Sequence, residues 1–172
     1  NNTYEMYKSG WYGINIDLNP LTIDLFNFAR KKDININAAI SNNEENKTLY
    51  FVDELNTQNT LEANHLLFLK NHHNLKEEEI SEQTIKTRRL DKILDSYNFN
   101  EIDFMNIDVE GHELNIINSI DFLKYKIKFI CIEMIDHNDQ AKLINEKLNA
   151  ILTRNGYALE KKIDFNFIFK KD

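Results

Sequence analysis

Short apolar runs alternate with segments of helical spacing along most of this chain. Apolar runs of about four to eight residues indicate buried strands, and apolar residues about three or four positions apart indicate one face of a helix. Regular alternation of the two is typical of an α/β sheet whose faces are covered by helices. The predicted strands are residues 11–17, 34–40, 48–52, 84–87, 102–108, 127–133, 157–163 and 166–169. Helices are predicted at 4–9, from Pro20 onward, and at 91–97, 113–119 and 139–155.

Two of these helices carry a clear apolar face in the sequence. Proline suits the first turn of a helix, so one of them is predicted to begin at Pro20, directly after Asn19. Its predicted core-facing residues are Leu21, Leu25, Phe28 and Ala29. In the helix at 139–155 the predicted core-facing residues are Leu143, Leu148, Ile151 and Leu152. Each helix is therefore expected to cover the sheet with one side.

Length and chain order indicate a single domain of mixed α/β type. With 172 residues the chain can bury one sizeable core, but it is too short for two. Strands 157–163 and 166–169 are separated only by a tight turn at Asp164, so they are predicted to form an antiparallel hairpin. Residues 53–81 are polar and irregular apart from helical spacing at 61–69, and we interpret them as a variable insertion.

Charge and composition argue against several classes of function. The formal net charge is −7 and no basic stripe offsets it, whereas a nucleic-acid partner needs clustered lysine and arginine. No apolar run approaches the ~18 residues that span a membrane, and no signal peptide is recognisable at the start. The single cysteine, Cys131, lies within an apolar strand, where it is a poor candidate for a nucleophile. We expect a cytoplasmic location, because the chain offers no disulfide framework.

The richest group of candidate functional residues follows the strand at 102–108. This strand is apolar on both faces, which predicts a buried strand of a parallel sheet. The residues that follow it are Asp108, Glu110, Gly111, His112 and Glu113. A second apolar strand ends on Glu133. Ligands of open α/β sheets bind at the carboxyl ends of strands, so we expect Asp108 and Glu133 to face one crevice.

Each candidate has a functional and a structural interpretation. For Asp17, at the end of the strand 11–17, the spacing favours a cap for the helix that follows, and the residue is also suited to bind both hydroxyls of a ribose. Asp108 can act as a general base, hold a metal, bind an amine or cap a helix. His112 can take a proton near neutral pH, or it can simply lie exposed in a first helical turn. Glu110 and Glu113 are also favoured there by the helix dipole.

A metal site is a further alternative, and other catalytic motifs are missing. Asp108, Glu133 and Asp136 offer oxygen ligands for a divalent cation, with His137 nearby, but no tight ligand spacing enforces such a site. The chain has no glycine-rich dinucleotide or phosphate loop and no Gly-x-Ser-x-Gly elbow. Nucleoside-triphosphate chemistry and serine hydrolysis therefore have no support.

Several segments, taken in order, resemble the FkbM-type S-adenosylmethionine-dependent methyltransferase family. Residues 102–113 resemble the family signature Ile-Asp-x-x-x-Ile-Asp-Val-Glu-Gly-x-Glu. Residues 10–20 resemble its second-strand segment, in which a Glu or Asp precedes Asn-Pro. The other segments that occur in the expected order are 38–41, 87–91, 129–133 and 166–169. The resemblance covers nearly the whole chain.

By this resemblance the fold is a Rossmann-like class I methyltransferase sheet of seven strands, mostly parallel with an antiparallel C-terminal hairpin. The implied function is S-adenosylmethionine-dependent O-methylation of a hydroxyl on a sugar or another small-molecule or glycan acceptor. Residues 53–81 would then shape acceptor specificity. A catalytically silent Rossmann-like binding module is the alternative, and a metal-dependent enzyme that uses Asp108 and Glu133 is a third reading. The oligomeric state is not indicated.

The resemblance also implies a role for each candidate residue. The residues implied in cofactor binding are Asp17, Leu18, Asn19, Ala39, Ser41 and Asp108. The residues implied on the acceptor side are Glu110, His112 and Glu133. Asp17 would bind the ribose, Leu18 would lie against the adenine, and residues 39–41 would lie near the adenine edge. Asp108 or His112 would take the proton of the acceptor hydroxyl.

One part of the family pattern is not found. The first strand of the family, with its Asp-x-Gly-Ala-type loop, should precede Asn2. We therefore expect residues 1–172 to be a single methyltransferase-like domain that is truncated at its N-terminus. The strands that contain Ile14 and Ile107 would each lose a neighbour and leave unpaired backbone groups. Cofactor binding by this chain alone is expected to be weak.

Overall fold

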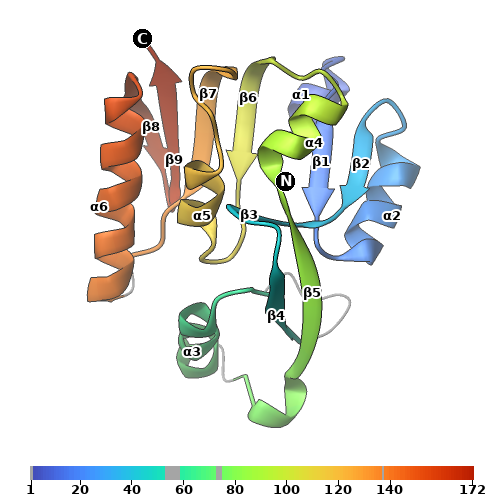
Figure 1. Ribbon diagram of the computed structural model, residues 1–172, viewed down its shortest axis with the longest axis vertical. Coiled ribbons are helices and arrows are strands. Elements are labelled where there is room, and N and C mark those ends of the chain that lie inside the picture. The colour runs from blue at the N-terminus through green and yellow to red at the C-terminus, as the bar shows by residue number, and fades with distance from the viewer. Residues whose placement is uncertain (1, 53–58, 73–74, 137) are drawn as a thin grey trace.

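A four-stranded sheet carries most of the buried core. The computed structural model describes residues 2–52, 59–72, 75–136 and 138–172 (Figure 1). The sheet consists of β6 (Glu101–Ile107), β7 (Lys126–Glu133), β9 (Asn166–Lys171) and β8 (Tyr157–Ile163), in that spatial order. β6 and β7 are parallel, and β9 is antiparallel to both of its neighbours. The predicted C-terminal hairpin is confirmed, with Asp164 in a left-handed conformation (φ 52°) at its turn.

Two smaller sheets complete the strand pairing. The first consists of the parallel strands β1 (Ile14–Asp17) and β2 (Ile34–Asn37). The second consists of β3 (Ala39–Ser41), β5 (Ser81–Arg89) and β4 (Asn46–Phe51), in that spatial order. Figure 1 shows β4 and the first half of β5 projecting away from the other strands, beside α3 (Ala63–His72). The strand predicted at 34–40 is interrupted at Ala38, because β1 ends at Asp17 and the chain beyond it pairs with β5 instead.

The remaining helices pack against strands of all three sheets. They are α1 (Tyr4–Lys8), α2 (Pro20–Ala29), α4 (Leu90–Ser96), α5 (Glu113–Asn118) and α6 (Asp139–Arg154), with a 3₁₀ turn η1 (Glu77–Glu79). α2 packs on β1 and β2, whereas α6 packs on α5 and β8. Fully buried side chains of the core include Ile93, Ile117, Ile127, Ile130, Ile132, Leu148, Leu152 and Phe169. Among the described residues, no helix is both long and apolar enough to cross a membrane.

A gap separates β1 from β6. The arrows of the two strands point the same way in Figure 1, yet within the described residues β1 pairs only with β2, and β6 pairs only with β7. A cavity of about 340 Å³ lies between them, and its apolar lining includes Ile14, Ile16, Met105, Ile107 and Leu94. This is the position at which the resemblance predicts a further strand. That a further strand pairs with β1 and β6 at this position stays a prediction.

Several apolar side chains that were predicted to face the core are exposed. Phe28 is 81% exposed and Leu25 is also exposed, whereas Ile23 is the buried residue of α2. The helix docks through a different side because it covers only the narrow pair β1 and β2. In α6, Leu148 and Leu152 are buried as predicted, but Leu143 is exposed. β6 is likewise not buried on both faces: only Ile107 is fully buried, because the strand borders the open gap.

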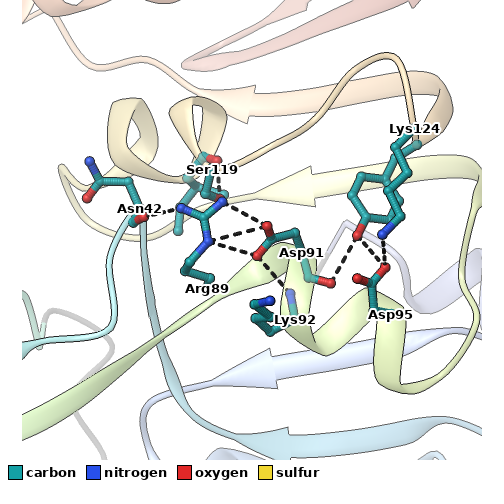
Figure 2. Close-up of polar contacts among 9 residues, drawn as sticks. Asn42, Arg89, Asp91, Lys92, Asp95, Ser119 and Lys124 are labelled. Atoms are coloured by element: carbon teal, nitrogen blue, oxygen red, sulfur yellow. Dashed lines mark hydrogen bonds and ion pairs between the residues drawn. The ribbon is translucent and has the colours of Figure 1, made fainter.

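Arg89, at the end of β5, joins three segments of the chain (Figure 2). Its guanidinium donates to the Asp91 carboxylate at 2.8 and 3.0 Å and to the Asn42 carbonyl at 2.6 Å. The hydrogen bond with Arg89 lowers the pKa of Asp91. On the other side, the Tyr125 hydroxyl donates to the carbonyl of Asp91 and to the carboxylate of Asp95. These contacts hold the residue after Ser41 against the start of α4.

Candidate active site

Carboxylates gather at the carboxyl ends of the strands on both sides of the gap. Asp17 is the last residue of β1, Asp108 follows β6, and Glu133 is the last residue of β7. The Asp108 side chain stays open to solvent, but nearby protein atoms remove part of its hydration and raise its pKa. The charges of Glu110 and Asp17 raise the pKa of Asp108 further. Asp17 and Asp108 therefore share one electrostatic environment.

Asp17 supports the start of α2 without capping the helix itself. Its Oδ1 accepts a hydrogen bond of 2.8 Å from the backbone N–H of Asn19. Asn19 is the N-cap, because its Oδ1 accepts the N–H of Leu21 at 2.9 Å. Burial raises the pKa of Asp17 despite that backbone hydrogen bond. Leu18, between the two, is half-buried, and its carbonyl accepts from the Asn37 amide.

Glu113 fixes the loop between β6 and α5. Its carboxylate accepts the backbone N–H groups of Val109 and Gly111 at 3.1 and 3.2 Å. The loop needs this support because Glu110 and Gly111 both have positive φ, 52° and 94°. Burial raises the pKa of Glu113, although the backbone hydrogen bonds act in the opposite direction. Glu113 thus has a structural role in the loop that carries Asp108 and Glu110.

His112 is buried, so its predicted exposure is wrong. Its side chain lies between Ser41 and Glu62, with Nε2 3.1 Å from the Ser41 hydroxyl and Nδ1 2.5 Å from Glu62 Oε1. Because a carboxylate oxygen only accepts, Nδ1–H of His112 donates to Glu62, and Nε2 lies against the Ser41 hydroxyl. Both ring nitrogens are therefore engaged. Ala39 and Ser41 are buried as well, and neither side chain reaches an open surface.

Three residues that the sequence did not single out close over the Glu110 loop. The Thr60 hydroxyl donates to the Glu110 carbonyl at 2.7 Å, and Glu62 holds His112. The ring of His65 packs against Gly111, and its Nε2 lies 3.0 Å from Glu110 Oε2. All three lie in the predicted variable insertion, of which residues 53–58 and 73–74 fall outside the described part. Only the helical spacing at 61–69 signalled that this stretch packs on the domain.

Glu133 lines a second, smaller cavity of about 90 Å³. Burial is the main reason that its pKa is raised to about 7, and the charges of Asp108, Glu110 and Glu113 add to the effect. Asp108 is thus close enough to Glu133 to influence its ionisation. Burial likewise raises the pKa of Cys131, which is the opposite of what an activated thiol needs.

The described residues provide no cluster of ligands for the metal site considered above. No group of three or more histidine, cysteine, aspartate or glutamate side chains there is arranged to hold a metal ion. Asp136 is exposed, and His137 lies outside the described residues.

Comparison with models of known protein families shows the family to which the chain belongs. The family model for the Methyltransferase FkbM domain matches residues 1–159. The chain belongs to the FkbM methyltransferase family. The resemblance found in residues 10–20 and 102–113 is thereby confirmed, and membership of a methyltransferase family implies an acceptor substrate and suggests a methyl donor. Comparisons with curated proteins and with solved structures gave no match.

In this FkbM domain, replacement of Gly111 by alanine is expected to destabilise the fold by about 2 kcal/mol. Gly111 has a φ of 94°, which an L side chain rarely adopts, and an added Cβ would lie 3.1 Å from Cβ of His65. Urea unfolding measures the loss. Gly13→Ala is the matched control, because nothing lies within 4 Å of a Cβ added there. Equal losses in the two variants would contradict the role assigned to Gly111.

Replacement of Glu133 by glutamine is expected to stabilise the domain at about pH 8 and to change little at about pH 4. Because the folded pKa is about 7 and the ordinary value is 4.5, the folded chain binds more protons between these values. Stability therefore falls as the pH rises through this window. The variant has no carboxylate to ionise, so at about pH 8 its free energy of unfolding should exceed that of the parent by about 2 kcal/mol, after allowance for partial solvent exposure. Urea unfolding over this pH range tests it. Glu160→Gln at an exposed site is the control, and parallel stability curves for parent and Glu133→Gln would contradict the prediction.

Proposed function

We propose that this domain is an S-adenosylmethionine-dependent O-methyltransferase that acts on a hydroxyl of a sugar or another small-molecule or glycan acceptor. The observation that carries the proposal is the placement of Asp17 and Asp108 at the carboxyl ends of β1 and β6, close enough that the charge of Asp17 contributes to the raised pKa of Asp108. Membership of the FkbM methyltransferase family supports the same reading.

The residues present fit this cofactor at both of its ends. The Asp17 carboxylate can accept hydrogen bonds from two adjacent ribose hydroxyls, and half-buried Leu18 offers an apolar surface for the adenine. Asp108 and Glu110 create a negative field that favours a positively charged sulfonium. When bound, the cofactor supplies an electrophilic methyl group. Asn19 keeps Asp17 oriented through its backbone N–H.

We assign the general base to Asp108. Its raised pKa makes it a stronger base than an ordinary aspartate, and its side chain is open to solvent. His112, the other candidate, is buried and has both ring nitrogens engaged, so it serves to position Ser41 and Glu62. Glu110 and Glu133 would face the acceptor. The protein thus contributes mainly by orienting two reactants and by accepting one proton.

The gap between β1 and β6 is proposed to take one further parallel strand, supplied from upstream of Asn1. With it, the spatial order becomes β2-β1-strand-β6-β7-β9-β8, a seven-stranded Rossmann-like sheet in which only β9 is antiparallel. Such a strand would pair the facing backbone groups of β1 and β6, which otherwise depend on water. It would also cover the apolar lining contributed by Ile16 and Met105.

Calorimetric titration with S-adenosylhomocysteine tests the proposal on two proteins. One is the 172-residue chain, and the other is a form extended upstream through the proposed strand and its loop. We expect saturable binding by the extended form and weak binding by the shorter chain. Slower hydrogen exchange of the β1 and β6 amides in the extended form would support the added strand. A folded extended form that does not bind would overturn the proposal and favour a silent Rossmann-like binding module.

A further inference from the structure

The loop between β6 and α5 contains an unfavourable backbone conformation at Glu110. Among the described residues other than glycine, three have a positive φ: Asn98, Glu110 and Asp164. Asparagine and aspartate tolerate the left-handed conformation comparatively well, whereas it is unfavourable for a glutamate. Glu110 therefore keeps its φ of 52° because its surroundings hold it there.

One segment of the chain, residues 59–65, holds Glu110 at two points. The Thr60 hydroxyl donates to the Glu110 carbonyl at 2.7 Å, and His65 Nε2 lies within ion-pair distance of Glu110 Oε2, at 3.0 Å. Thr60 and His65 are 1% and 5% exposed, so water competes little for either contact. The left-handed turn is thus fixed from outside its own loop.

The segment that holds Glu110 is itself anchored on β4. Thr60 and Tyr50 exchange backbone hydrogen bonds of 2.9 and 3.2 Å. Asn59 Oδ1 accepts the backbone N–H of Val52 at 2.8 Å. Thr60 is therefore a fixed support, and the position of the Glu110 turn depends on it.

Asp108 depends on this support because its side chain is not held directly. Among the described residues, none donates a hydrogen bond to the Asp108 carboxylate. Its position is set by the loop backbone, which Glu113 holds from within and which Thr60 and His65 hold from outside. Partial loss of hydration is the main cause of the raised pKa of Asp108, and the charge of Glu110 adds to it. A shift of the turn would therefore change both the place and the basicity of Asp108.

We propose that Thr60 and His65 are positioning residues for methyl transfer, which act by fixing the loop that places Asp108. The predicted variable insertion then helps to place the general base, in addition to shaping acceptor specificity. This inference rests on the proposed function, because the effect passes through Asp108 as the base. A purely structural role would lower the stability of the domain and leave the rate of the folded protein unchanged.

Thr60→Val in the extended form is the main test, because it removes the hydroxyl and keeps the shape of the side chain. The assay is methyl transfer from S-adenosylmethionine to a panel of monosaccharides. We expect kcat to fall about tenfold, because a misplaced reacting group is costly. KM for the acceptor and the dissociation constant of S-adenosylhomocysteine should change less than about twofold. Thr60→Ser keeps a hydroxyl, so its kcat should lie within about twofold of the parent.

Thr87→Val is the matched control for the loss of a buried hydroxyl. The Thr87 side chain is fully buried, and its hydroxyl donates to the Asn43 carbonyl at 2.7 Å, outside the Glu110 loop. Urea unfolding should show similar losses of stability for Thr60→Val and Thr87→Val. Only Thr60→Val should lower kcat, and the kcat of Thr87→Val should change less than about twofold.

His65→Phe tests the second contact. Phenylalanine keeps a ring against Gly111 but cannot pair with the Glu110 carboxylate. Because a partly exposed ion pair is worth little, kcat should fall only about threefold. A kcat equal to that of the parent would overturn the role assigned to His65.

The Asp108→Asn background shows whether the effect of Thr60 passes through the base. There, Thr60→Val should lower kcat less than about twofold, because the group that it helps to place is gone. A tenfold loss in both backgrounds would overturn the proposal, as would equal losses of kcat in Thr60→Val and Thr87→Val.

Hydrogen exchange of the Gly111 amide separates this inference from the proposed function. In the 172-residue chain, Thr60→Val should speed that exchange about tenfold, and this readout needs neither cofactor nor methyl transfer. Unchanged exchange, or an unchanged kcat in the extended form, would overturn the proposal. An extended form in which even the parent transfers no methyl group would instead refute the proposed function.

Discussion

In the extended form, Asp17→Ala is expected to weaken S-adenosylhomocysteine binding by at least about a hundredfold. The carboxylate would accept charge-assisted hydrogen bonds from two ribose hydroxyls, each worth about 1.5–3 kcal/mol. Their joint loss exceeds about 3 kcal/mol, which corresponds to a factor of a hundred or more in the dissociation constant. Calorimetric titration measures the change. Asp24→Ala is the control, because Asp24 is exposed on α2 and has no proposed role.

Asp17→Asn separates the two roles of this residue. The asparagine keeps an oxygen that can accept the backbone N–H of Asn19, so the start of α2 should stay intact. It loses the charge and one acceptor position, so binding should still fall by about tenfold or more. If Asp17 serves only to hold the turn, Asp17→Asn will bind like the parent, and the assignment to the ribose will be wrong. Equal free energies of unfolding for the parent and Asp17→Asn would show that a difference in binding does not come from a loss of folded structure.

Asp108→Asn is expected to lower kcat for methyl transfer by about 10²–10⁴-fold with little change in KM for the acceptor. The amide has nearly the same shape as the carboxylate but cannot take the hydroxyl proton. The measurement is the transfer of a labelled methyl group from S-adenosylmethionine to a panel of monosaccharides without and with an amino group. Asp24→Asn, at an exposed position, is the control.

The pH dependence of that reaction provides a second readout. Because partial loss of hydration and the charges of Glu110 and Asp17 raise the pKa of Asp108, the rate should rise with pH through a point above the usual aspartate range. Asp108→Asn should remove this rise. A variant that keeps both the rate and the pH profile of the parent would exclude Asp108 as the base. His112→Gln would then become the next variant to test, with unfolding measured alongside because His112 is buried.

The sequence by itself determined the order and type of the main elements. The predicted helix at 139–155 corresponds to α6, and the predicted strands at 102–108 and 127–133 correspond to β6 and β7. These predictions succeed because the period of apolar residues and the turn at Asp164 act locally, within one element or one hairpin. The same holds for Asp17, Asp108 and Glu133, since a residue at the end of a predicted strand is located by the strand itself.

Only the tertiary structure decided which faces and which partners those elements have. Periodicity shows that residues share a face, but the neighbours of a helix determine which face docks, so Ile23 is buried in α2 and Phe28 is exposed. The burial of His112 depends on Ser41 and Glu62, which lie 71 and 50 positions away in the chain. Glu62 and His65 carry no motif, because their importance comes from the loop that they touch. The gap between β1 and β6 is likewise a property of strand pairing, which arises between distant segments and leaves no local pattern in either strand.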